Sequence, residues 1–325
     1  MEPQNPKNQM KALFFDGANL KLQYNYAQPK LGEALVRVKF AGICGTDLEM
    51  LQGYASFRGV PGHEFVGVVA DSQDKALIGK RVVGEINVGC QKCDMCQRGL
   101  ERHCPDRTVL GIHKRNGAFA EFLSLPEKNL HVLPDLISDK QAVFVEPLAA
   151  AFEIQEQLSI KPDSKIAVLG DGRLGQLITR VMKTTHQNIV CFGRHQNKLG
   201  LLQKMGVKTK TEITQEDQHS FDVVIEATGS ESGFSDTIRL AKPRGVVVLK
   251  STTASKNKLD ISPAIVNEIT FVGSRCGPFR PAIDALALGT IKVDDLIDKI
   301  YSLDEYDKAL KQAASSGVLK ILLKP

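Results

Sequence analysis

The sequence predicts an α/β fold in which a β-rich first third precedes a parallel sheet covered by helices on both faces. In the first third, short apolar runs at residues 35–40, 65–70 and 81–83 are separated by glycine-rich turns and lack helical periodicity, which is typical of strands. Beyond residue 147, short β-branched strands alternate with amphipathic helices, as they do in parallel sheets. The length of 325 residues accommodates about two domains.

The elements of the second part follow one another in a regular order. Strands are predicted at residues 165–169, 188–192, 222–226, 246–250 and 270–274, and helices at residues 176–183, 196–205 and 281–288. A later helix should open at Ser302, because Ser302 and Glu305 have the spacing of a capping box. The apolar run at residues 318–323 predicts a final strand.

Composition and charge argue against several classes of protein. With 42% hydrophobic and 24% charged residues, the chain has the composition of an ordinary globular protein. It has a polar N-terminus and contains no run of about 18 apolar residues, so neither a secretory signal nor a membrane span is predicted. The net charge of +5 is scattered rather than concentrated, so nucleic acid is not an expected partner. We expect a cytoplasmic protein.

A glycine-rich turn follows the first strand of the parallel sheet, where residues 165–175 read KIAVLGDGRLG. In a dinucleotide site, Gly170 permits the tight turn, Gly172 lets the pyrophosphate approach, and Gly175 allows close packing of helix on strand. The N-terminus of the following helix offers free amides to the phosphates, and Arg173 and Leu174 of the turn are further candidates for cofactor binding. A flexible loop is the alternative, but the strand–turn–helix context favours a doubly wound, Rossmann-type cofactor domain.

The end of the second strand bears on the choice between NAD and NADP. NAD sites usually place an acid there to bind the ribose diol, but residues 191–195 read CFGRH and contain none. Arg194 can pair with a 2′-phosphate through a bidentate fork, with His195 and Lys198 as helpers. Arg194 could also be a solvated loop residue. We favour NADP over NAD.

Four cysteines lie within fifteen residues, at a spacing suited to one metal ion. Four thiolates close the coordination sphere of a tetrahedral zinc, so the site should be structural and should order a lobe at about residues 89–105. Ferredoxin-type ligation has three residues before its fourth cysteine, whereas seven occur here. Four unligated cysteines are the other alternative. The predicted ligands are Cys90, Cys93, Cys96 and Cys104.

Two further motifs, taken with those above, carry a family resemblance. Residues 42–47 read GICGTD and residues 62–67 read GHEFVG. In this order, and followed by the cysteine cluster, the EPLA segment at residues 146–149 and the glycine turn, they resemble the zinc-containing medium-chain dehydrogenase/reductase family, in its sorbitol, threonine and glucose dehydrogenase branch. The resemblance extends from Met10 to Leu323.

The resemblance implies a domain plan. A GroES-like, β-rich catalytic domain would comprise residues 1–145 and 280–325, and a Rossmann domain at residues 146–279 would be inserted within it. It implies a homodimer or homotetramer, and two zinc ions per chain, one catalytic and one structural.

The resemblance also assigns ligands to the catalytic zinc. Cys44 and His63 match the family's first two ligands, Glu64 matches an adjacent glutamate that can move on and off the metal, and Glu146 occupies the position of a further ligand. Zinc with one thiolate, one imidazole and one carboxylate is neutral, and a second carboxylate would weaken its Lewis acidity. We therefore hypothesise that Glu64 and Glu146 do not both bind the metal directly while an alkoxide is present.

Three more residues receive roles by the same resemblance. Thr46 matches the hydroxyl that relays the alcohol proton toward solvent. Where many relatives continue this relay with a histidine, this chain has Glu49, so either Glu49 or water takes the proton, or Glu49 merely faces solvent. Arg275 resembles a residue of the late loop near the nicotinamide, and a salt bridge at the sheet end is the alternative.

The predicted function is that of a zinc-dependent oxidoreductase that transfers a hydride between an alcohol and NAD(P). The alcohol would be a polyol, sugar or amino alcohol, and the sequence does not identify it, because pocket walls come from distant segments. The alternatives are a zinc-free quinone or enone reductase of the same superfamily and a cofactor-binding protein without catalysis. Both conflict with the presence of the complete set of metal-ligand candidates.

Overall fold

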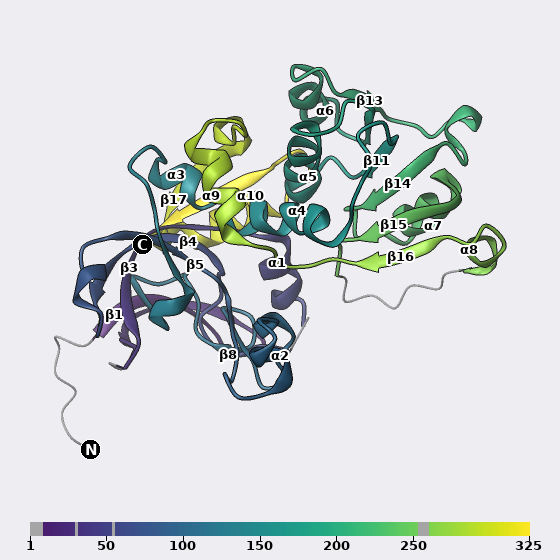
Figure 1. Cartoon of the computed structure of the whole chain (residues 1–325). Coiled ribbons are helices and arrows are strands. Elements are labelled where there is room, and N and C mark those ends of the chain that lie inside the picture. The colour runs from purple at the N-terminus through teal and green to yellow at the C-terminus, as the bar shows by residue number, and fades with distance from the viewer. Residues whose placement is uncertain (1–8, 30–31, 54–55, 253–259) are drawn as a thin grey trace. The chain divides into compact units, whose positions relative to one another are not determined.

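The protein divides into two compact units in a computed structural model, shown in Figure 1, that describes residues 9–29, 32–53, 56–252 and 260–325. The first unit comprises Met1–Glu146 and Leu296–Pro325, and the second comprises Pro147–Asp295. The first is β-rich and the second alternates strands with helices, so the predicted α/β class is confirmed. Within the described ranges, no helix combines the length and apolarity needed to cross a membrane.

The main sheet of the first unit joins both ends of the chain. Its strands run in the order β10-β5-β4-β3-β18-β17, with β9 also paired to β3. Strand β18 is antiparallel to β3 and parallel to β17, so the yellow C-terminal strands of Figure 1 complete a sheet begun near the N-terminus. The bounds are β3 (Ala34–Gly42), β4 (Glu64–Asp71), β5 (Arg81–Gly84), β9 (Phe122–Leu125), β10 (Leu130–Val132), β17 (Ile297–Ser302) and β18 (Lys320–Lys324).

Smaller elements surround this sheet. A hairpin joins β1 (Gln9–Phe15) to β2 (Leu20–Ala27), and a small sheet of β6 (Asn87–Val88), β7 (Thr108–Leu110) and β8 (Lys114–Arg115) flanks the cysteine-rich lobe. The predicted helix start near Ser302 is a 3-10 turn before α10, and the hydroxyl of Ser302 donates to Glu305 at 3.3 Å. The helical elements are α1 (Gly45–Leu51), α2 (Asp94–Gln97), α3 (Asp139–Ala142), α10 (Tyr306–Ala313), η3 (Lys75–Leu77), η4 (Glu101–His103), η5 (Glu127–Asn129) and η8 (Leu303–Glu305).

The pairing of β3 with both β4 and β18 produces a buried ion pair. Gly42 at the end of β3 lies opposite Glu64 on β4 and opposite Leu322 on β18. Lys320, at the start of β18, thereby reaches Glu64, with 2.5 Å between Nζ and Oε2. Both residues are buried, at 1% and 0% exposure. A Cβ on Gly42 would lie 2.2 Å from Glu64 Oε2, so this position must lack a side chain.

The second unit is built on a six-stranded parallel sheet in the order β13-β12-β11-β14-β15-β16. The predicted alternation of strands and helices is present, with α4, α7, α8 and β13 in addition. The strands are β11 (Ile166–Leu169), β12 (Ile189–Phe192), β13 (Lys208–Lys210), β14 (Phe221–Glu226), β15 (Ala241–Leu249) and β16 (Thr270–Gly273). The helical elements are α4 (Val145–Gln157), α5 (Arg173–Lys183), α6 (Gln196–Gln203), α7 (Glu231–Leu240), α8 (Ser262–Val266), α9 (Phe279–Ala287), η6 (Gln215–Asp217) and η7 (Asp294–Leu296).

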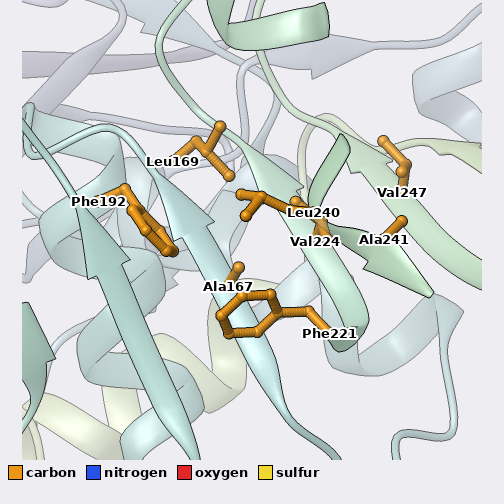
Figure 2. Close-up of a cluster of buried hydrophobic side chains, with 8 residues drawn as sticks. All are labelled: Ala167, Leu169, Phe192, Phe221, Val224, Leu240, Ala241 and Val247. Carbon is orange, nitrogen blue, oxygen red and sulfur yellow. The ribbon is translucent and has the colours of Figure 1, made fainter. Parts of the chain in front are cut away.

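A cluster of buried apolar side chains lies in this sheet. Figure 2 shows Phe192 of β12 and Phe221 of β14 among the residues of the cluster, with centroids 5.9 Å apart and the rings edge to face. Burial of apolar surface on strands that are short and β-branched stabilises the sheet and fixes its register. The eight members are Ala167, Leu169, Phe192, Phe221, Val224, Leu240, Ala241 and Val247.

The second unit extends further along the chain than the boundary we predicted at residue 280. Arg180 on α5 is almost fully buried at 2% exposure and donates to the carbonyl of Lys292 and, through both terminal nitrogens, to the carboxylate of Asp295. This bidentate contact holds the segment after α9 against the second unit, so the chain returns to the first unit at Leu296.

We predict that Lys320→Met lowers the free energy of unfolding by about 3–5 kcal/mol, because it leaves the Glu64 carboxylate buried without its counter-charge. Urea denaturation of the purified enzyme measures this. Lys324→Met, at the exposed end of the same strand, is the matched control and should change stability by at most about 0.5 kcal/mol. Equal small losses in both variants would contradict a stabilising role for the pair.

Candidate active site and metal centres

The strand pairing of the first unit brings three zinc-ligand candidates together. Cys44 lies between β3 and α1. His63 directly precedes β4, and Glu64 is the first residue of β4, which pairs with β3. One ligand atom of each residue lies within 4.8 Å of the others. His63 and Glu64 are buried and Cys44 is half-buried. A thiol, an imidazole and a carboxylate are the donor types that zinc prefers.

Asp47 is a buried residue of this site that the sequence analysis missed. Its Oδ2 accepts a hydrogen bond of 2.8 Å from the backbone N–H of Cys44, and its Oδ1 lies 3.2 Å from His63 Nδ1. Burial disfavours the charged imidazole, but the Asp47 carboxylate outweighs this and raises the pKa of His63 well above its ordinary value. With Nδ1 facing Asp47, Nε2 is left for a metal ion, the arrangement that orients many histidine ligands.

The Glu64 carboxylate supplies an independent test of whether a metal fits. Its Oε2 is paired with Lys320, whereas its Oε1 is buried and has no hydrogen-bond partner among the described residues. A buried carboxylate oxygen without a partner is costly, and metal coordination is one way to satisfy it. The residues present therefore fit a zinc ion.

The other predicted residues of this site are not members of the three-residue cluster. Glu146 is half-buried in the first turn of α4, and it is not a member of the three-residue cluster. On α1, Thr46 Oγ1 lies 3.8 Å from Cys44 Sγ, and Glu49 is half-buried one turn further on. Thr46 is therefore the predicted catalytic residue that the structure brings into contact with a ligand candidate.

The four lobe cysteines also converge, with their sulfur atoms within 4.8 Å of one another and none of the four in a disulfide. Backbone N–H groups of Lys92 and Cys93 lower the pKa of Cys90 to about 7, whereas burial raises the pKa of Cys96 to about 12. Four neighbouring thiolates repel one another unless a cation compensates them. The cluster thus fits the predicted closed zinc site at residues 89–105.

The glycine turn has the geometry that a bound pyrophosphate requires. Gly170 has a φ of +116°, and a Cβ on Gly175 would lie 1.9 Å from the carbonyl oxygen of Gly170, so both are required by the protein itself. Gly172 differs, because it has an ordinary φ of −73° and a Cβ there would meet no protein atom within 4 Å. The open space at Gly172 therefore fits a ligand, beside the start of α5 at Arg173 and Leu174.

The remaining cofactor candidates lie at the carboxyl ends of two strands. Arg194 is exposed and His195 is half-buried directly after β12. Arg275 is exposed after β16, and its carbonyl accepts a hydrogen bond of 2.9 Å from Lys250 Nζ. Lys250, which the sequence analysis missed, also donates to Ala150 O and Ser274 Oγ. A buried lysine therefore holds the loop that carries Arg275.

Two family models match this chain. The alcohol dehydrogenase GroES-like domain matches residues 30–135, and the glucose dehydrogenase C-terminus matches residues 140–323. The second match covers more than half of the chain. Together the two matches cover most of the range from Met10 to Leu323 over which the resemblance was predicted.

Individual relatives agree with these matches. D-arabinitol dehydrogenase 1 of Uromyces fabae is 30% identical over 316 residues, which are 90% of either chain. A protein of Sinorhizobium meliloti 1021 described as a zinc-binding dehydrogenase, solved with NADP, is 30% identical, with a TM-score of 0.88 and 97% and 99% coverage. An Escherichia coli CFT073 alcohol dehydrogenase complexed with NADH is 25% identical, with a TM-score of 0.87 and 97% and 99% coverage.

These matches agree with the features described above, which are the sheets of the two units, the cysteine, histidine and glutamate cluster, and the glycine turn. The chain belongs to the zinc-dependent medium-chain dehydrogenase family, in its sorbitol- and polyol-like branch.

Proposed function

We propose that this protein oxidises a polyol or sugar alcohol, or reduces the corresponding carbonyl compound, with a catalytic zinc and a nicotinamide cofactor. The observation that carries the proposal is the cluster of Cys44, His63 and Glu64, in which the buried Glu64 Oε1 lacks a hydrogen-bond partner among the described residues. The arabinitol substrate in the name of the Uromyces fabae relative supports the polyol class.

When bound, zinc would act as a Lewis acid that acidifies the alcohol, and the nicotinamide would accept the hydride. The protein's own residues do the rest. Asp47, 3.2 Å from His63 Nδ1, would orient that imidazole. We assign to Thr46, whose Oγ1 lies 3.8 Å from the Cys44 sulfur, the role of passing the alcohol proton onward. For the next proton acceptor, Glu49 and water remain open.

The Lys320 ion pair bears on the hypothesis that Glu64 and Glu146 do not both bind the metal. Lys320 Nζ lies 2.5 Å from Glu64 Oε2, so its positive charge offsets the negative charge of the carboxylate. A carboxylate with less net charge binds a metal cation more weakly. We propose that the pair keeps Glu64 from binding as a second full carboxylate when Glu146 occupies the metal. The cluster contains Glu64 and not Glu146. Glu146 is therefore proposed as a ligand on the family resemblance alone.

We further propose a preference for NADP. Arg194 is exposed at the place where NAD sites carry an acid, and its guanidinium has no hydrogen-bond or ion-pair partner in the described part of the chain. The Sinorhizobium meliloti relative with NADP supports this choice, although the Escherichia coli relative was solved with NADH.

A homodimer or homotetramer and a cytoplasmic location complete the proposal. β16 is an edge strand of its sheet, and it is accompanied by exposed apolar side chains of Phe271, Ile265 and Val266, the last at 81% exposure. An apolar sheet edge of this kind favours pairing with another chain. Cysteines clustered as metal ligands rather than as disulfide partners favour a reducing compartment.

A screen of polyols, sugars, amino alcohols and their carbonyl counterparts tests the activity. We expect cofactor reduction with at least one polyol or sugar alcohol, followed by the ultraviolet absorbance of the reduced nicotinamide. Cys44→Ser should abolish it, because that variant removes the thiolate of the metal cluster. A zinc-loaded protein that is inert toward the whole panel would contradict the proposal.

Metal analysis tests the structural site. We expect about two zinc ions per chain in the parent enzyme and about one in Cys93→Ser, with faster proteolysis within residues 89–105, because the metal orders this lobe. Cys276→Ser, whose cysteine lies outside both clusters, is the control and should retain both ions. Full zinc content in Cys93→Ser would argue against a four-cysteine site.

Substitution of Arg194 tests the cofactor preference. Arg194→Ala should lower kcat/KM for NADP⁺ by about tenfold or more, as expected for loss of a charged phosphate contact, and change the value for NAD⁺ by less than about threefold. Arg244→Ala removes an exposed arginine of the same unit near the opposite end of the sheet and serves as the control. A parallel loss with both cofactors would count against recognition of the 2′-phosphate.

A further inference from the structure

Asp171 stands between two glycines of the cofactor turn, yet its side chain points into the protein. Only 6% of the residue is exposed. Its Oδ2 accepts hydrogen bonds from the backbone N–H groups of Arg194 at 2.7 Å and of His195 at 2.6 Å. These donors lie 23 and 24 residues later in the chain, so one carboxylate ties the turn after β11 to the turn after β12.

His195 completes the environment of this carboxylate. Its Nδ1 lies 3.0 Å from Asp171 Oδ1 and 3.1 Å from Oδ2, so three protein nitrogens surround the acid. Charge-assisted hydrogen bonds of this kind are among the stronger ones in proteins. Because α6 begins at the next residue, Gln196, the contact fixes the main chain at the point where β12 gives way to the helix.

Gly193 makes room for the arrangement. A Cβ at this position would lie 2.5 Å from both the Cβ and the Oδ2 of Asp171. The backbone of Gly193 does not have a positive φ, so space rather than conformation requires glycine here. The absent side chain and the buried acid are therefore two parts of one feature.

This feature has a consequence for the cofactor. An acid near this turn would favour NAD if its oxygens accepted hydrogen bonds from the ribose diol. The oxygens of Asp171 are already engaged by the protein, and its negative charge, which would repel a 2′-phosphate, is compensated by the surrounding donors. The same contacts hold the main chain of Arg194 while leaving its guanidinium exposed.

We propose that Asp171 is a positioning residue that determines cofactor specificity, by holding Arg194 and His195 in the arrangement that accepts the 2′-phosphate of NADP. The inference rests on the proposed NADP preference and adds the residue that builds the subsite. Asp171 acts through the turn and not by touching the cofactor phosphate.

Calorimetric titration of the purified enzyme with NADP⁺, NAD⁺, 2′,5′-ADP and 5′-AMP tests this by binding alone. In Asp171→Ala, the affinity for NADP⁺ and 2′,5′-ADP should fall by about tenfold, and the affinity for NAD⁺ and 5′-AMP should change by less than about threefold. A merely structural role would weaken all four ligands alike and leave the ratio of NADP⁺ to NAD⁺ affinity unchanged.

Two further variants distinguish a change in the turn after β12 from a general loss of stability. Gly193→Ala should reproduce the change in ratio with the acid still present, because its methyl group displaces the Asp171 carboxylate. Asp222→Asn is the matched control, since Asp222 also accepts from a backbone N–H, that of Lys165 at 2.8 Å, but near the opposite end of the sheet. It should leave the ratio unchanged.

The outcomes are distinct. A parent enzyme that binds NAD⁺ more tightly than NADP⁺ would overturn both the NADP preference and this inference. A parent enzyme that prefers NADP⁺, with an unaltered ratio in Asp171→Ala, would overturn the inference alone. A selective loss of NAD⁺ binding in Asp171→Ala would show that the acid accepts from the ribose diol, and would overturn it as well.

Discussion

The buried ion pair between Glu64 and Lys320 is the contact that holds one ligand candidate of the first unit's metal cluster in place. Removing two charges from water is costly, so each residue needs the other once both are buried. The pair also connects the C-terminal strand β18 to the start of β4, so the last residues of the chain take part in building the site. One carboxylate oxygen remains available for a metal because Lys320 engages the other.

The second unit uses the same physical device for a different purpose. Asp171 is a buried carboxylate compensated by protein donors, and it organises the turn that carries Arg194. In both units a glycine on a neighbouring strand end makes the space, Gly42 beside Glu64 and Gly193 beside Asp171. The charge of each acid is matched by donors brought from another strand, and the absence of a Cβ lets the acid approach the backbone.

Local patterns predicted the features whose chemistry lies within one short segment. The cysteine cluster and the glycine turn could be found from spacing, because all their members come from a single loop or a single strand–helix junction. Asp47 had a weaker signal, three residues after Cys44 at a helix start. Nothing in the sequence pointed to Lys320. The role of Glu146 as a zinc ligand was assigned from the family resemblance alone, and the cluster of ligand atoms does not include Glu146.

The sequence by itself determined the α/β class, the order of strands and helices, the two groups of metal-ligand candidates and the family. These follow from periodicity, turn chemistry and short spacings, which act over a few residues. Only the tertiary structure decided that Glu64 is paired with Lys320, that Arg180 keeps residues 292–295 in the second unit, and that Asp171 faces inward. Each of these depends on strand pairing or packing between segments far apart in the chain, and whether a charge is buried or solvated depends on those neighbours.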